Sequence, residues 1–240
     1  MLEILKTVYA FCEPFATIRF LLKKNLQSVI KNNYMAGSLI DIGCGSMPYR
    51  HLFPRHIDYR GIDYSQFSKY DRFSFNIPDF FFDLNYEYDF RLPFSDNVFN
   101  IVVCFQVLEH HSNAETLVSE CARICSHHGT LIFTTPFISG IHESPNDYVR
   151  YTKFGLQKLF EDQKLKVTYV KENGGLFSAI FLLINETWSL LYSKSRLHTR
   201  LFLFLIYPLL LSLSYLAIIL DLIWPSDTIC PNYIICAIKD

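Results

Sequence analysis

Residues 39–48 read LIDIGCGSMP, a short apolar run that continues into two closely spaced glycines. Such a run followed by glycine is typical of a buried strand that ends in a tight turn. Because glycine has no Cβ, Gly43 and Gly45 let the backbone turn sharply and approach a ligand closely. Asp41 adds a carboxylate within the strand. The stretch therefore predicts a strand whose carboxyl end borders a ligand site.

A second acidic residue favours the same interpretation. The next predicted strand, 59–63, ends in Asp63, about 20 residues after the first glycine, where a carboxylate can accept both hydroxyls of a ribose. The glycines alone would also fit a plain tight turn without a ligand. After Gly45 the chain continues Ser46-Met-Pro and has no third glycine of a pyrophosphate-binding turn. This departure favours a ligand that lacks a pyrophosphate.

The rest of the chain alternates short apolar runs with segments of helical periodicity. Helices are predicted over 114–126, ended by Gly129, and over 152–162, capped by Thr152. Strands are predicted at 38–43, 59–63, 79–83, 99–105, 130–135, 165–170 and 232–238. This order predicts an α/β fold with a doubly wound, seven-stranded, mostly parallel sheet. An N-terminal helical cap (1–33) precedes the predicted domain (34–240), which contains an apolar helical insertion (176–226).

Charge and cysteine usage exclude several classes of protein. The chain has 240 residues, with 22 Lys and Arg against 23 Asp and Glu, so no excess of basic residues predicts nucleic-acid binding. Its seven cysteines include no C-x-x-C pair. The histidine pairs at 110–111 and 127–128 lack the spacing of metal ligands, so no metal site is predicted. The odd number of cysteines, most of which lie in apolar runs, and the absence of a signal-peptide pattern favour a reducing, cytoplasmic location.

Four stretches together resemble the class I S-adenosylmethionine-dependent methyltransferases. They are DIGCGS at 41–46, GIDYS at 61–65, LPFSDNVFNIVVCFQVLEH at 92–110 and HHGTLIFTTPF at 127–137. The resemblance covers residues 37–171 and the last predicted strand. It implies a Rossmann-like methyltransferase fold with S-adenosyl-L-methionine as the cofactor. The implied reaction is an in-line displacement at a sulfonium methyl group, in which proximity and orientation supply most of the catalysis.

The same resemblance implies which residues hold the cofactor. Asp41 would stand near its methionine ammonium group, Asp63 would hold its ribose hydroxyls, and Gln106 would face its methionine end. Met47 stands where the family usually has a third glycine. The implied cofactor-binding residues are Asp41, Gly43, Cys44, Gly45, Asp63, Tyr64, Asp83, Leu84 and Gln106.

The segment after the fifth predicted strand is rich in polar side chains. It reads PFISGIHESPNDYVRYT at 136–152 and emerges at the ligand edge of the predicted sheet. His142 is the predicted general base, because an ordinary imidazole titrates at a pH of about 6.5. Asp147 and Arg150 could alternatively only pin the loop. The predicted catalytic residues are His142 and Glu143, and the predicted substrate-binding residues are Asp147, Arg150, Tyr151 and His110.

The apolar insertion is the second feature that bears on function. Of the 20 residues at 201–220, 17 are apolar. A helix of this length and composition is long enough to span a bilayer. If this helix alone crossed a membrane, the last strand would lie on the opposite side from the rest of the sheet. If both helices of the insertion crossed it, the basic loop 193–200 would be exported, against the tendency of basic loops to stay inside. We therefore expect a helical pair, kinked at Pro208, that lies peripherally on the cytoplasmic membrane face. A buried pair, a homodimer interface and a spanning hairpin are the alternatives. The basic helix 1–33 is a second expected membrane contact.

These features predict an enzyme that O-methylates a saccharide or a lipid-linked cell-envelope precursor at the cytoplasmic membrane face. The substrate class rests on resemblance, since segments similar to 142–152 are common in bacterial methyltransferases of sugar and envelope biosynthesis. Methylation of a quinone-like lipid is the alternative reaction. A non-catalytic, membrane-associated scaffold that retains the fold is the alternative of another class.

Overall fold

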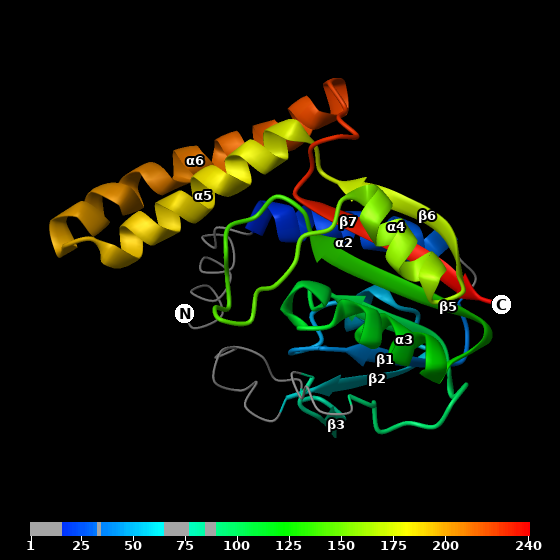
Figure 1. The fold of residues 1–240 in the computed structure, drawn as a ribbon. Coiled ribbons are helices and arrows are strands. Elements are labelled where there is room, and N and C mark those ends of the chain that lie inside the picture. The colour runs from blue at the N-terminus through cyan, green and yellow to red at the C-terminus, as the bar shows by residue number, and fades with distance from the viewer. Residues whose placement is uncertain (1–15, 33–34, 65–76, 85–89) are drawn as a thin grey trace. The chain divides into compact units, whose positions relative to one another are not determined.

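Figure 1 shows a computed structural model, which describes residues 16–32, 35–64, 77–84 and 90–240. The first half of the predicted cap, residues 1–15, lies outside the described residues. The chain forms two compact units. One contains residues 1–25, 138–140 and 172–232, and the other contains residues 26–137, 141–171 and 233–240.

A seven-stranded sheet lies at the centre of the second unit, with the strand order β3-β2-β1-β4-β5-β7-β6. β3, β2, β1, β4 and β5 pair in parallel, and β7 runs opposite to β5 (Figure 1). The predicted α/β fold with a mostly parallel, seven-stranded sheet is confirmed. The strands are β1 (Ser38–Ile42), β2 (Asp58–Asp63), β3 (Phe80–Phe81), β4 (Phe99–Phe105), β5 (Cys125–Pro136), β6 (Leu165–Asn173) and β7 (Asn232–Lys239).

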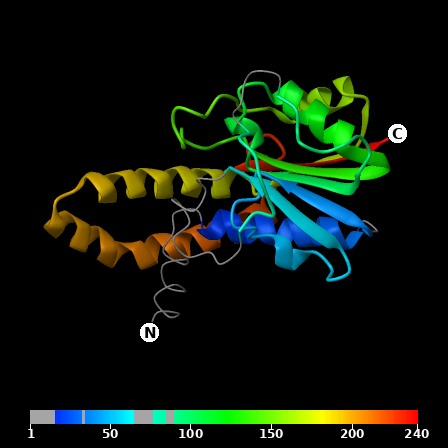
Figure 2. The ribbon, with the colours of Figure 1, turned by 90° about the horizontal axis from the view of Figure 1, so that it is seen from below.

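Helices cover both faces of this sheet (Figure 2). α3 (Ala114–Ile124) and α4 (Lys153–Asp162) lie on one face, and residues 26–32 of α2 (Ala16–Asn32) lie on the other. The rings of Phe133 on β5 and Phe160 on α4 meet edge to face at 5.0 Å, and both side chains are fully buried. Thr152 caps α4 as predicted, since its side chain accepts a hydrogen bond from the Gly155 amide at 3.2 Å. Two short 3-10 helices, η1 (Arg50–Leu52) and η3 (Leu108–His110), follow β1 and β4.

The predicted role of Gly129 is wrong. α3 ends at Ile124 and β5 begins at the next residue, so Gly129 lies inside a 12-residue strand. The left-handed conformation belongs to His128, whose φ is 61°. An added Cβ on Gly129 would lie 2.6 Å from the Cys125 Sγ and 2.9 Å from the carbonyl oxygen of Asn100 on β4. The glycine is therefore required by close packing around the start of β5, and not by a helix-terminating turn.

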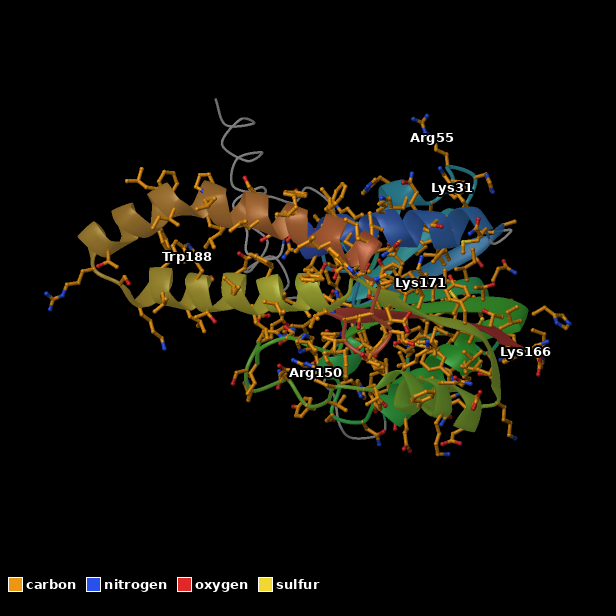
Figure 3. The ribbon with its side chains drawn as sticks, turned by 90° about the horizontal axis from the view of Figure 1, so that it is seen from above. Lys31, Arg55, Arg150, Lys166, Lys171 and Trp188 are labelled. Carbon is orange, nitrogen blue, oxygen red and sulfur yellow. The ribbon has the colours of Figure 1, made fainter. Side chains whose placement is uncertain are left out.

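The first unit contains the predicted helical pair, α5 (Leu176–Lys194) and α6 (Leu197–Ile223), and α6 continues through Pro208. Asp221 of α6 accepts hydrogen bonds from the backbone amides of Gly175, Phe177 and Ser178, at 3.0, 2.9 and 3.0 Å. It thereby satisfies amides that the start of α5 leaves unpaired. Halfway along, the Asn185 side chain donates to the Ser214 Oγ at 2.9 Å. Trp188 points from α5 toward α6 (Figure 3).

Much of the apolar surface of this pair is exposed. Among the described residues, one helical segment, Phe204–Ile223, is long and apolar enough to cross a membrane, and 17% of it is buried. The helix of a soluble protein's core can meet the same length and composition criterion. The exposed large apolar side chains of α6 are Phe204, Leu205, Leu209, Leu216, Ile219, Leu222 and Ile223. An apolar surface of this kind is typical of a contact with a membrane or another protein.

We predict that Ile132→Ala in β5 lowers the free energy of unfolding by about 2–5 kcal/mol, because the side chain has no exposed surface and its removal leaves a cavity. Ile77→Ala is the matched control. Since Ile77 is 72% exposed, that change is expected to stay within about 0.5 kcal/mol. Denaturant titration of both variants measures the difference, and equal losses would contradict the packing described for β5.

Candidate functional site

The carboxyl ends of β1, β2 and β4 meet at one edge of the sheet, since Ile42 pairs with Ile62 on one side and with Cys104 on the other. The chain turns there at Gly43, whose φ is +68° and whose amide donates to the Ile62 carbonyl at 2.9 Å. An added Cβ on Gly43 would collide with the Val107 side chain. Only glycine therefore lets this turn pass so close to the segment after β4.

Asp63 joins the glycine turn to the end of β2. One carboxylate oxygen accepts a hydrogen bond from the Gly45 amide and the other from the Tyr64 amide, each at 2.6 Å. Burial raises the pKa of Asp63, the two amides lower it, and the charge of Glu143 raises it again. Because each carboxylate oxygen accepts two hydrogen bonds, Asp63 retains acceptor positions for a ligand.

Asp41 lies in β1 with 1% of its surface exposed. The Tyr59 hydroxyl donates to Oδ2, whereas Oδ1 is buried without a hydrogen-bond partner among the described residues. Burial raises the pKa of Asp41 to about 7, against the lowering effect of Tyr59. Because a buried oxygen without a hydrogen bond is costly, a positively charged or hydrogen-bond-donating group beside Oδ1 would stabilise this carboxylate. The contribution of Tyr59 was not predicted from the sequence.

The other predicted cofactor residues also follow strand ends. Cys44 is buried, and burial raises the pKa of its thiol. Tyr64 is 40% exposed. Asp83 is exposed and Leu84 is buried; both follow β3, whose Phe81 pairs with Asp63. The register therefore places these two residues at the same edge as Asp63.

Gln106 turns the chain out of β4. Its φ is 57°, a costly value for a residue with a side chain. Two hydrogen bonds to Thr134 of β5 hold it, from the Gln106 amide to the carbonyl oxygen at 2.9 Å and from Nε2 to Oγ1 at 3.0 Å. This turn leads into η3 and places Glu109 and His110 at the ligand edge.

Residues 141–151, which we call the site loop, bring further polar groups to η3. The rings of His110 and His142 are perpendicular, with centroids 4.8 Å apart. The His110 Nε2 lies 3.9 Å from the Glu143 Oε2, and its Nδ1 lies 2.5 Å from the carbonyl oxygen of Asn146. The structure thus brings together His110, His142 and Glu143, three of the predicted site residues.

Asp147 and Arg150 hold the site loop in place. The Arg150 guanidinium donates to both oxygens of Asp147, at 2.5 and 2.8 Å, and thereby lowers the pKa of Asp147 to about 2. The same carboxylate accepts from the His142 amide at 3.0 Å. Figure 3 shows Arg150 on this loop. These contacts match the loop-pinning alternative, and a direct substrate contact by Asp147, Arg150 or Tyr151 stays a prediction.

Glu109 is a buried carboxylate that the sequence analysis left out of the predicted site residues. It has no exposed surface, and burial raises its pKa to about 8. Its Oε2 lies 3.5 Å from the Thr135 Oγ1, whereas Oε1 has no hydrogen-bond partner among the described residues. The sequence did contain a sign of this, since Glu109 follows the apolar pair Val107-Leu108 directly.

Comparisons with known proteins agree on the fold. Residues 40–133 match the family model described as a methyltransferase domain. No curated protein matches the chain. Among solved structures, a Bacillus halodurans protein inferred to be a methyltransferase has a TM-score of 0.55 at 13% identity, with 90% of this chain and 98% of that chain covered.

Two further solved structures show how widely this fold is used. A phosphoethanolamine N-methyltransferase of Haemonchus contortus, solved with S-adenosyl-L-methionine, has a TM-score of 0.52 at 16% identity and covers 90% of this chain and 52% of its own. The cyclase SpnF has a TM-score of 0.53 at 16% identity, with coverages of 90% and 80%. These likenesses concern the fold, and the reaction has to be argued from the site.

We predict that stability falls as the pH rises from about 4 to about 7, because unfolded Asp41 loses its proton before folded Asp41 does. The loss contributed by this group is on the order of 4 kcal/mol, since a tenfold change in proton affinity equals about 1.4 kcal/mol. Asp41→Asn should remove this contribution, because the amide stays neutral and still accepts from Tyr59. Denaturant titrations at pH 5 and pH 8 test this, and the same pH dependence in both proteins would contradict it.

Proposed function

We propose that this chain, whose residues 40–133 match the methyltransferase-domain model, is a class I S-adenosylmethionine-dependent methyltransferase that O-methylates a saccharide or a lipid-linked cell-envelope precursor. The observation that supports this most directly is the group formed by His110, His142 and Glu143. The group borders the ligand edge, because the charge of Glu143 acts on Asp63. A proton acceptor at this place suits a hydroxyl as the methyl acceptor.

The residues at the ligand edge fit the cofactor. The orphaned Oδ1 of Asp41 suits the ammonium group of the methionine moiety, and Asp63 keeps acceptor positions for ribose hydroxyls. Gly43 and Gly45 contribute no side chains to the turn. When bound, S-adenosylmethionine supplies a methyl group on a positively charged sulfur that is already activated for transfer. The remaining residues proposed to line its site are Cys44, Tyr64, Asp83, Leu84 and Gln106.

The site loop supplies the base in this proposal. His142 would take the proton of the acceptor hydroxyl, a contribution of roughly 10²–10⁴ in rate for a placed base. Asp147, fixed by Arg150, holds the His142 backbone amide and lies 3.6 Å from its Nδ1. Glu143 adds a second carboxylate at the exposed rim of the site.

The apolar helical pair supports a lipid-linked acceptor. α6 exposes large apolar side chains along much of its length, as the pair would if it lay on a membrane. The end of α5 exposes Lys194 and the connection to α6 exposes Arg196, and both would meet anionic headgroups. We therefore propose a peripheral position on the cytoplasmic membrane face, where a lipid-linked precursor is within reach.

A transfer assay tests the proposed function. Purified chain is incubated with cofactor carrying a labelled methyl group and a total envelope extract, and the products are partitioned between organic and aqueous phases. We expect label in the organic phase as an acid-labile, sugar-containing lipid, with transfer lost in His142→Ala and kept in His51→Ala, an exposed histidine of η1. Label on a sugar-free lipid would favour the quinone-like alternative. Cofactor binding without transfer would favour the scaffold.

We predict that Asp63→Asn weakens cofactor binding by about 1–3 kcal/mol, roughly 5–150-fold in Kd, because the amide loses the charge and one acceptor oxygen. Asp58→Asn, an exposed acid at the other end of the same strand, is the matched control and should leave Kd unchanged. Calorimetric titration with S-adenosylmethionine measures both values. Equal affinities of wild type and Asp63→Asn would refute the role of Asp63.

We predict that the double variant Leu205→Lys/Leu209→Lys binds lipid vesicles at least tenfold more weakly than the wild type. Both leucines are largely exposed on α6, and burying each one is worth roughly 1.5–3 kcal/mol. Phe154→Lys, a 77% exposed apolar residue of α4, is the control for an added charge. Co-sedimentation with phosphatidylcholine–phosphatidylglycerol vesicles measures the binding, and an unaffected double variant would place the membrane contact elsewhere.

A further inference from the structure

A carboxylate and two imidazoles come together from two separate loops. Glu109 and His110 belong to η3, and His142 belongs to the site loop. One ligand atom from each of the three side chains lies within 4.8 Å of the other two. Imidazole nitrogens and carboxylate oxygens are the donor set that divalent transition metals take in proteins.

The state of Glu109 points independently to a missing positive partner. The side chain has no exposed surface, and its Oε1 has no hydrogen-bond partner among the described residues. This oxygen lies 3.7 Å from the His110 Nε2, on the side where the cluster gathers. A buried carboxylate oxygen without a donor is costly, and a bound cation would offset that cost.

The two histidines are already oriented by second contacts. The His110 Nδ1 lies 2.5 Å from the carbonyl oxygen of Asn146, which places the ring proton on Nδ1 and leaves the lone pair of Nε2 toward Glu109 and Glu143. The backbone amide of His142 donates to Asp147, whose Oδ2 also lies 3.6 Å from the His142 Nδ1, and Arg150 fixes this carboxylate in turn. Metal-binding histidines characteristically have such outer partners, which set the tautomer and the ring direction.

We propose that Glu109, His110 and His142 form a binding site for a divalent transition-metal ion, with Glu143 at the rim as a fourth ligand. Metal–ligand distances of about 2.0–2.2 Å place neighbouring ligand atoms roughly 3–3.5 Å apart. The most widely separated ligand atoms therefore have to approach by roughly 1.5 Å. The movement falls on the site loop, which carries His142 and Glu143, since η3 is anchored in the sheet through Gln106.

The metal site deepens the proposed function but does not depend on it. An acceptor hydroxyl bound to the ion would lose its proton more readily, a role that rests on the proposed O-methylation. A metal-bound imidazole has no free lone pair, so in the metal-bound state the hydroxyl proton would pass to solvent water instead of to His142. Metal binding itself requires only the three ligands. Spacing along the chain does not predict this site, because more than 30 residues separate His142 from Glu109 and His110.

The test is a titration of the EDTA-treated 240-residue chain with CoCl₂, followed by visible absorption and by calorimetry. We choose Co²⁺ because its absorption reports its ligands, and thiolate binding would add a separate charge-transfer band. We expect one ion per chain without a thiolate band, although six described cysteines are free. Glu109→Gln and His142→Ala should each weaken binding at least tenfold.

Matched controls keep the outcome decisive. Glu115→Gln on the exposed face of α3 and His51→Ala in η1 change the same residue types away from the cluster, and both should bind Co²⁺ as the wild type does. His142→Ala alters a loop position, so it remains informative if Glu109→Gln fails to fold. Absence of saturable binding by the wild type, a thiolate band, or unchanged affinity in His142→Ala would each overturn the proposal. No methyl transfer is measured, so failure of the proposed function leaves this result intact.

Discussion

The hydrogen bonds from the Gly45 and Tyr64 amides to the Asp63 carboxylate are the contacts on which the ligand edge depends. They fix the turn after β1 against the end of β2. Gly43 completes this junction, because its positive φ and missing Cβ let Val107, which follows β4, approach the turn. Three strand ends are thereby held in one arrangement, in which Asp41 and Asp63 lie close enough for their charges to interact.

Two buried carboxyl groups lie at this edge of the sheet. Asp41 and Glu109 are both buried carboxylates with raised pKa values, about 7 and about 8, and each has one oxygen without a partner among the described residues. Such groups destabilise a fold unless a ligand satisfies them. The apolar strands offset the cost, since Val102, Val103, Ile132 and Phe133 have no exposed surface. The pattern is typical of a site whose groups are arranged for binding.

The helical pair is stabilised by its own polar contacts. Asp221 satisfies three amides at the start of α5, and Asn185 donates to Ser214 between the helices. These contacts tie α5 to α6 at one end and halfway along. The apolar side chains on the outside of the pair are therefore not needed to hold it together, which leaves them for a lipid surface in the proposed function.

Local patterns in the sequence determined the strands around the ligand edge, the glycine turn and the cap at Thr152, because periodicity, backbone freedom and capping act over a few residues. They failed at Gly129, since the packing that requires this glycine involves Asn100 on the neighbouring strand. Only the tertiary structure decided that Tyr59 donates to the Oδ2 of Asp41 and that Asp147 pins the site loop. It alone joined Glu109 and His110 to His142, because β5 separates these residues in the chain and parallel pairing with β4 brings their loops to one edge.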